Sequence, residues 1–146
     1  MFYNPVLTAG VLGWAAAQVI KFILYLVQNA DVKLERLYGS GGMPSSHSSL
    51  VCAAFVSCGR LVGWDSPITA AFFVFGAIVM YDAANVRLEA GKHAKQLNEI
   101  MQRLLAQDGD NDSKMKEFKE LLGHTPLQVV CGAILGILIG AIIPLQ

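Results

Sequence analysis

The stretch Pro126-Leu-Gln-Val-Val-Cys-Gly-Ala-Ile-Leu-Gly-Ile-Leu-Ile-Gly-Ala-Ile-Ile-Pro-Leu145 contains no charged residue. A helix needs about 20 mostly apolar residues to cross the hydrocarbon core of a bilayer, and this stretch meets that requirement. Three further stretches come close to it, over residues 5–27, 45–64 and 67–86. We therefore predict an all-α fold: a polytopic membrane helix bundle of about four transmembrane helices, forming a single membrane domain over residues 1–146.

The composition of the chain agrees with this prediction. Hydrophobic residues make up 54% of the sequence and charged residues 15%, against roughly 25% charged residues in soluble domains. A compact soluble bundle is the alternative, because Arg60 and Asp82 interrupt the ends of the second and third stretches. The formal net charge is +0, so the composition gives no reason to expect nucleic acid as a partner.

Charge asymmetry predicts the orientation of the chain. Nine of the 11 lysine and arginine residues lie in the loops that follow the first and third crossings, while Arg60 alone lies in the short opposite loop. Basic loops face the cytoplasm in membrane proteins. We therefore expect an integral membrane protein with both larger loops in the cytoplasm.

The third loop, over about residues 88–123, is predicted to be an inserted cytoplasmic helical loop. Leu97, Ile100 and Leu104 follow helical spacing, which indicates an amphipathic helix. The polar run that begins at Asp108 should end this helix, and a second short helix should follow and stop at Gly123. Both helices are expected along the membrane surface or against a partner chain.

A cluster of glycine and serine residues precedes the second crossing and contains two candidate phosphate-binding residues, Ser45 and Ser46. Free amides at a helix N-terminus bind anions, although Ser45 or Ser46 can equally act as a simple N-cap. His47 follows directly, and a histidine beside a bound phosphate can donate a proton to a departing oxygen near neutral pH.

A second candidate catalytic histidine, His124, precedes the fourth crossing. Thr125 and Gln128 have the spacing of a capping box, so a structural role explains both of them. An imidazole at this position would face the positive end of its own helix and could attack phosphorus as a nucleophile.

Two cations complete the candidate site. Lys21 lies within the first crossing, where it either reaches for the membrane surface or binds a phosphate oxygen. Arg87 ends the third crossing as an interfacial anchor or as a bidentate phosphate ligand. In the four-crossing topology these two cations and both histidines fall at the same membrane face, which favours a phosphate site over separate structural roles.

These residues resemble the motifs of the type 2 phosphatidic acid phosphatase superfamily, which includes the vanadium-dependent haloperoxidases, and in particular its small divergent branch. Pro44-Ser-Ser-His47 looks like the Pro-Ser-Gly-His motif of that family. The segment that begins at His124 looks like the end of the third motif, and Arg87 looks like the family arginine. The resemblance implies that His124 forms a phosphohistidine and that His47 protonates the leaving oxygen.

Several positions depart from the family pattern. Gln128 stands where the family has an aspartate, and we consider Asp82 as a replacement carboxylate beside His124, with pairing to Arg87 as the alternative. The first motif lacks its Arg-Pro, so Lys33 or Arg36 could take the place of Lys21. A competing alignment takes His93 as the family histidine, but no crossing follows it.

The resemblance implies a membrane phosphatase that hydrolyses a lipid phosphate or diphosphate without cofactor or metal. Its expected partners are membrane lipid and the phosphorylated lipid substrate. A catalytically inactive scaffold or phosphate-binding protein is the alternative, and a transporter is a poorer one. Gly132, Gly136 and Gly140 share one helix face, which predicts close helix packing or a homodimer.

Overall fold

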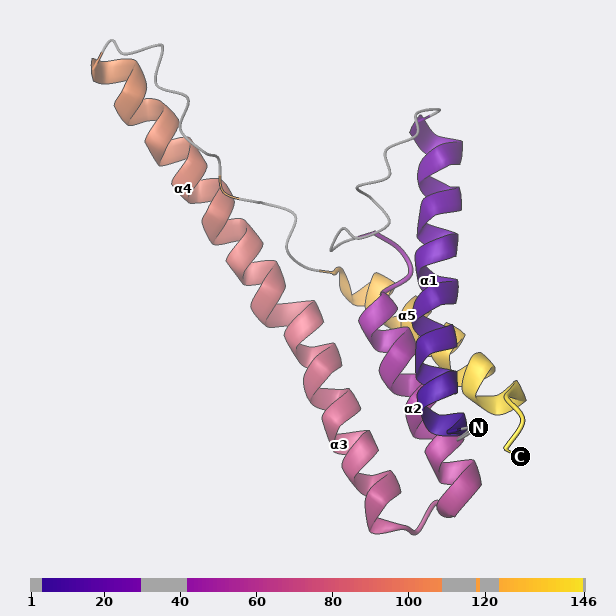
Figure 1. Cartoon of the computed structure of the whole chain (residues 1–146). Coiled ribbons are helices and arrows are strands. Elements are labelled where there is room, and N and C mark those ends of the chain that lie inside the picture. Colours follow the sequence, from indigo (N-terminus) through magenta and orange to yellow (C-terminus); the bar gives the residue numbers. More distant parts are fainter. Residues whose placement is uncertain (1–3, 30–41, 109–117, 119–123, 146) are drawn as a thin grey trace.

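The computed structural model describes residues 4–29, 42–108, 118 and 124–145. Every regular element in these ranges is helical, which confirms the predicted all-α class. The elements are α1 (Pro5–Asn29), α2 (Ser46–Val62), α3 (Pro67–Tyr81), the π-helical segment η2 (Asp82–Val86), α4 (Arg87–Asp108) and α5 (Pro126–Ile142). The two ends of the described chain lie at the same end of the bundle, opposite to the end from which α4 projects (Figure 1).

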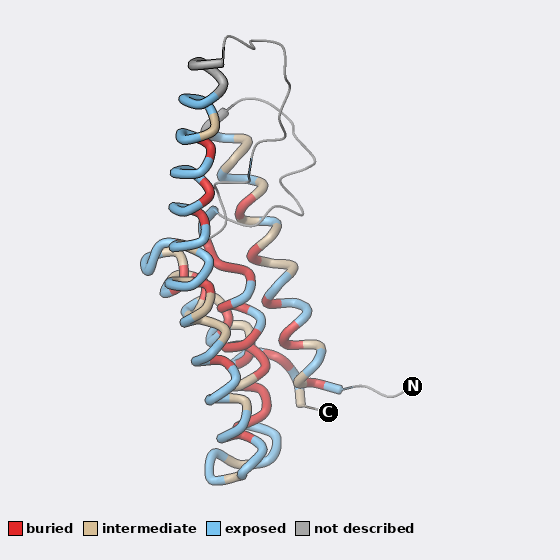
Figure 2. The backbone as a smooth tube through the Cα atoms, turned by 90° about the vertical axis from the view of Figure 1, so that its left-hand side faces the viewer, coloured by how far each residue is buried: buried red, intermediate tan, exposed pale blue. Residues whose placement is uncertain are grey.

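Helix α2 forms the centre of the bundle and contacts α1, α3 and α5. The buried positions of α2, coloured red in Figure 2, are serine, alanine, cysteine and glycine residues, with only valine larger. The large apolar side chains point outward instead: Leu7, Phe73 and Ile78 are each about 60% exposed or more. This is the reverse of a soluble protein, whose large apolar residues fill the core. The membrane bundle is confirmed and the soluble alternative is rejected.

Glycines allow α5 to pack directly against the backbone of α2. A Cβ atom at Gly132 or Gly136 would overlap the carbonyl oxygen of Ser45 or Ser49, respectively. Small residues permit such close approach between membrane helices. The glycine face predicted from the sequence therefore contacts a helix of the same chain.

Helix α3 continues through η2 into α4 without a break (Figure 1). The apolar helical run Pro67–Leu104 has 38 residues, which at 1.5 Å per residue is about 57 Å, well beyond a hydrocarbon core of about 30 Å. We expected a third crossing and then a separate amphipathic helix, and the structure joins them into one. The predicted end of this helix at Asp108 agrees with the structure, whereas the second short helix lies outside the described residues except for Phe118.

Two helical runs are long and apolar enough to cross a membrane, Pro5–Val27 and Pro67–Leu104, and Pro126–Ile142 is apolar but shorter. The exact crossing boundaries stay predictions. What positions the functional site is the short length of α2 and α5: each has 17 residues. At the end of the bundle from which α4 projects, α1 and α4 therefore extend further than the N-termini of α2 and α5 (Figure 1).

Candidate functional site

The N-termini of α2 and α5 are joined to each other and to η2 by backbone hydrogen bonds. The Ser45 amide donates to the Gln128 carbonyl at 2.9 Å, and the His124 amide donates to the Ala83 carbonyl at 3.1 Å. The second bond uses the carbonyl of the one buried residue of the π-helical segment. These bonds connect three segments that are distant in sequence. The place where the N-termini of α2 and α5 meet η2 is called the corner below.

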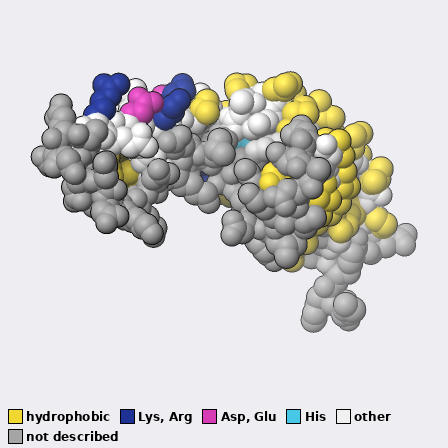
Figure 3. Space-filling view, turned by 90° about the horizontal axis from the view of Figure 1, so that it is seen from above, with side chains coloured by type: hydrophobic (Ala, Val, Ile, Leu, Met, Phe, Trp, Pro, Cys, Tyr) yellow, Lys and Arg dark blue, Asp and Glu magenta, His cyan; other side chains and the backbone are white. Residues whose placement is uncertain are grey.

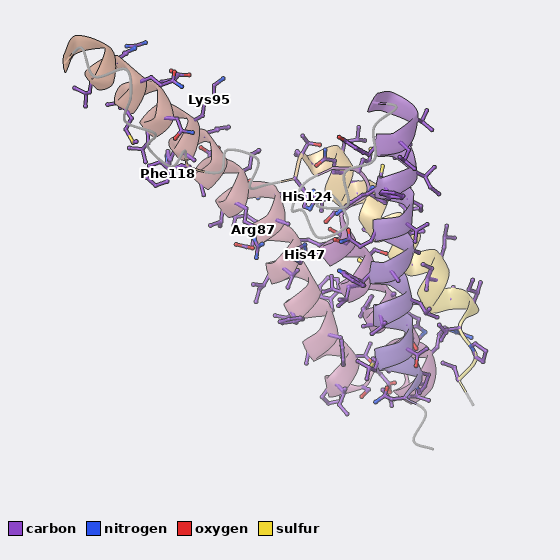
Figure 4. All side chains as sticks on the ribbon, turned by 45° about the horizontal axis from the view of Figure 1, so that its top comes forward. His47, Arg87, Lys95, Phe118 and His124 are labelled. Carbon is purple, nitrogen blue, oxygen red and sulfur yellow. The ribbon has the colours of Figure 1, made fainter. Side chains whose placement is uncertain are left out.

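The two candidate histidines face each other at this corner (Figure 4). The ring centroids of His47 and His124 are 6.4 Å apart, with an interplanar angle of 59°. His124 is only 3% exposed, whereas His47 is exposed. One imidazole is therefore held inside the bundle, and the other lies at the opening of the corner. Seen from the end of the molecule, histidine lies between the charged side chains of the projecting helix and the hydrophobic bundle (Figure 3).

Lys21 is buried beside the same corner, at 8% exposure, and its Nζ donates to the Ser46 hydroxyl at 3.2 Å. The side chain points into the bundle. The alternative, in which Lys21 extends to the membrane surface, does not agree with the structure. Among the described residues, no carboxylate forms an ion pair with Lys21. A buried ammonium group without a counter-ion is costly, and a bound anion would neutralise it.

The two serines are placed differently from each other. Ser45 is the N-cap of α2, since its hydroxyl accepts the Ser48 amide, while its own amide is used by the Gln128 carbonyl. Of the two, only Ser46 directs its hydroxyl to Lys21. The proposed contact of phosphate with the amide of Ser45 is therefore not available in this arrangement, whereas the Ser46 side chain is well placed.

Arg87 and Asp82 form an ion pair, with 2.6 Å between Arg87 Nε and Asp82 Oδ2. Both side chains are partly exposed, at 49% and 38%. The structure does not bring Asp82 to His124 as the replacement carboxylate; it shows the alternative, pairing with Arg87. The π-helical segment explains the pair, because residues five apart stack only when the helix widens to i→i+5 hydrogen bonding, as in the bond from the Arg87 amide to the Asp82 carbonyl.

Gln128 takes the place beside His124, with its Oε1 3.1 Å from Nδ1 of the imidazole. The same oxygen accepts the Thr125 amide at 3.1 Å in the capping box of α5. Because the capping bond requires the oxygen to point this way, the contact requires a hydrogen on Nδ1. Neutral His124 then carries its lone pair on Nε2. Gln128 thus selects the tautomer that an aspartate would select, without contributing negative charge.

Burial lowers the pKa of His124 below its ordinary value of 6.5. The positive charges of Lys21 and His47 lower this pKa further, while hydrogen bonds to Gln128 and to the backbone of Gly42 act against the shift. The neutral, nucleophilic form of His124 is therefore favoured at and above neutral pH.

The sequence analysis missed the π-helical segment, the Ala83 carbonyl that holds His124, and the backbone of Gly42. No pattern in the sequence marks the widened turn, but Gly42 has φ 82°, a conformation for which glycine is the usual residue. Lys33 and Arg36, the alternatives to Lys21, lie outside the described residues. His93, the competing histidine, lies about two turns beyond Arg87 on the projecting helix.

Comparison with known proteins identifies the family of the chain. The chain is 35% identical over 131 residues to the uncharacterized membrane protein YuiD of Bacillus subtilis (strain 168), covering 84% of this chain and 83% of that protein. No solved structure matches the chain. The family profile described as the Divergent PAP2 family matches residues 2–139, which include both histidines, Lys21 and Arg87. The resemblance inferred from the motifs is thus confirmed, and the chain belongs to the divergent PAP2 family of membrane proteins.

Proposed function

We propose that this protein is a membrane phosphatase that hydrolyses a lipid phosphate or diphosphate through a phosphohistidine on His124. One observation carries the proposal: a buried histidine, an exposed histidine and a buried lysine without a carboxylate partner among the described residues meet at the N-termini of two helices. Helix N-termini and cations attract anions. Histidines supply the nucleophile and the acid that phosphate transfer needs.

In the first step Nε2 of His124 attacks phosphorus, and the bond between phosphorus and the leaving oxygen breaks. His47, at the exposed side of the corner, gives its proton to that oxygen, so the alcohol or phosphate product leaves neutralised. The hydrogen on Nδ1 of His124 stays bonded to Gln128. This bond holds the ring in the orientation that presents Nε2.

In the second step water attacks the phosphorus of the phosphohistidine and gives a proton to His47. The bond between phosphorus and Nε2 breaks, which releases inorganic phosphate and restores neutral His124. Lys21, assisted by the Ser46 hydroxyl, neutralises charge on the equatorial oxygens throughout. Arg87 can contribute once its guanidinium exchanges Asp82 for a phosphate oxygen, since both groups are partly exposed.

A scaffold or binding protein that keeps the phosphate pocket without turnover is the second candidate. Gln128 favours it, because an uncharged amide orients His124 but does not stabilise the positive charge that develops on the imidazole. The two candidates share the anion site and differ only in the chemical step.

The deciding experiment is phosphate release from lipid phosphates and diphosphates by detergent-purified protein with a chelator present. The wild type is compared with His124→Ala and with His93→Ala, a matched control on the projecting helix. We expect His124→Ala to lower release by at least about 10³-fold and His93→Ala to leave it unchanged. No release by the wild type, with vanadate still bound, would support the scaffold instead.

The acid role of His47 has a test of its own. His47→Ala should lower the hydrolysis of alkyl phosphates by roughly 10²–10⁴-fold. It should have much less effect on p-nitrophenyl phosphate, whose leaving group departs without a proton. Equal losses on both substrates would show that His47 binds the phosphate and does not protonate the leaving group.

A further inference from the structure

An apolar groove with a volume of about 600 Å³ lies between α1 and α3, over α2. Helix α2 contacts both of the other helices and separates them along this face (Figure 1). The residues that line the groove come from all three helices and carry no charge; they include Gly10, Val11, Leu50, Ala54, Leu61 and Phe72.

The groove is aligned with the candidate phosphate site. On α2, Leu50, Ala54 and Leu61 fall on the same helical face as Ser46, four, eight and fifteen residues after it. Ser46 is the residue whose hydroxyl binds Lys21. The groove therefore starts one helical turn from the cationic site and runs along α2 for about 16 Å.

The far end of the groove offers little to a polar ligand. Asn4 is the one residue with a polar side chain among those that line it. Its Oδ1 already accepts the amides of Val6 and Leu7, at 3.1 and 3.0 Å, where it caps α1. A polar site at one end and an uncharged groove beyond it fit a ligand with a phosphate head and one long hydrocarbon chain.

We propose that this groove binds the hydrocarbon chain of the substrate and sets the chain length that the enzyme accepts, a proposal that rests on the phosphatase function above. The chain gains little free energy from the groove itself, because it leaves one apolar environment for another. Its contribution is positional: a chain lying along α2 holds the phosphorus between Lys21 and His124. Small errors in position are costly to a reaction rate.

Tryptophan substitutions at two depths test the proposal with butyl, decyl and hexadecyl phosphate as substrates. Leu50 lies at the end of the groove near the site, and Leu61 lies further along it. These residues are 36% and 43% exposed, so each position can accommodate the indole ring of tryptophan. Val74→Trp is the matched control, because Val74 is exposed on α3 and does not line the groove.

We expect Leu61→Trp to lower kcat/KM about tenfold for hexadecyl phosphate alone, and Leu50→Trp to do so for decyl and hexadecyl phosphate. Butyl phosphate is too short to reach Leu61 and should be hydrolysed equally by the wild type and Leu61→Trp, and Val74→Trp should match the wild type for all three substrates. If butyl phosphate is hydrolysed and the two groove variants show no dependence on chain length, the groove proposal is wrong while the phosphatase function stands.

A binding measurement covers the case in which no substrate is hydrolysed and the phosphatase function fails. Hexadecyl phosphate with a diazirine at the chain terminus should label the groove segments of α2 and α3 in wild-type protein, and labelling should fall about tenfold in Leu61→Trp. Equal labelling by the corresponding alcohol would show an ordinary lipid-filled crevice and would overturn the proposal.

Discussion

A basic side chain lies near each end of α5, and the two basic groups make different kinds of contact. At the C-terminal end, Arg60 donates through Nη1 to the carbonyls of Gly140 and Ile143, at 2.8 and 2.9 Å. At the N-terminal end, Lys21 is buried and, within the described part of the chain, its Nζ donates to the Ser46 hydroxyl. A cation at a helix C-terminus satisfies carbonyls that have no other partner. A cation beside helix N-termini adds to positive potential that is already there.

The two cations therefore differ in their partners: Arg60 contacts backbone carbonyls, whereas Lys21 contacts a side-chain hydroxyl. Arg60 stabilises the fold because its partners are fixed parts of the chain. The contact of Lys21 within the described residues is a neutral hydroxyl, and we propose that a bound anion neutralises its charge. We therefore propose that the histidine end binds an anion, whereas the Arg60 end terminates a helix. Substitutions at the two ends should have opposite consequences for activity and stability.

Among the substitutions at the two ends of α5, the largest effect is expected from Lys21→Met, which removes the charge and nearly keeps the length of the side chain. Vanadate affinity and kcat/KM should fall about 100-fold, since one preorganised charge on the phosphate is worth roughly 2.7–4 kcal/mol. The melting temperature without ligand should stay the same or rise, because a costly buried cation is removed. Lys92→Met is the control, since Lys92 pairs with Glu89 on the exposed part of α4. Unchanged vanadate affinity in the Lys21 variant would show that Lys21 does not bind the anion.

Arg60→Met should give the opposite result. The carbonyls of Gly140 and Ile143 lose a charged donor, so the free energy of unfolding should fall by about 1.5–3 kcal/mol, measured by thermal denaturation in detergent micelles. Turnover by the folded fraction should stay within about twofold of wild type. A large loss of turnover with unchanged stability would mean that the two ends are not functionally distinct.

Gln128→Glu adds a negative charge at the histidine end while keeping the capping-box geometry. A carboxylate bonded to Nδ1 raises the pKa of His124 and stabilises the imidazolium, so we expect kcat to rise about tenfold. No gain in kcat, with the capping bond intact, would show that the missing charge does not limit turnover.

The pH dependence of kcat/KM tests the pKa of His124. Burial lowers the pKa of His124 in the folded wild type, so the acid limb of kcat/KM should lie below pH 6.5. The unfolded chain binds this proton more readily, so the contribution of His124 to stability should decrease as pH falls through about 6.5. In Gln128→Glu the acid limb should move to higher pH. An acid limb above pH 6.5 in the wild type would contradict the assignment.

The smallest effect is expected from Asp82→Asn. The carboxylate holds Arg87 in an exposed ion pair, and such pairs contribute little to stability, at most about 1 kcal/mol. Releasing the guanidinium should raise phosphate affinity about two- to threefold, measured by competition with vanadate. A strong loss of turnover would instead return Asp82 to a role beside His124.

Much of the fold and of the candidate site could be predicted from the sequence. The features that determine them are short segments or the order in which the chain crosses the membrane. Long uncharged runs predict membrane helices. The spacing of Thr125, Pro126 and Gln128 predicts a capped helix start, and the structure contains that capping box. The order of the crossings placed Lys21, His47, Arg87 and His124 at one end. Each of these inferences depends on residues close in sequence or on the direction in which the chain crosses the membrane.

The pairing of individual groups could not be predicted, because it depends on how the helices are rotated. The sequence left two partners open for Asp82, and the π-helical turn, which no pattern in the sequence marks, brings it to Arg87. The glycines of α5 could have served a homodimer equally well, and only the packed bundle shows that they contact α2.

The sequence by itself therefore determined that the chain is a membrane helix bundle with histidines and cations at one end. The hydrophobic run and the helix cap that specify these features are properties of single segments. The tertiary structure decided that the Lys21 Nζ contacts the Ser46 hydroxyl and that the ring centroids of His47 and His124 lie 6.4 Å apart. Those outcomes depend on distances between segments far apart in the chain, and they are set only when the glycine-lined helices pack together.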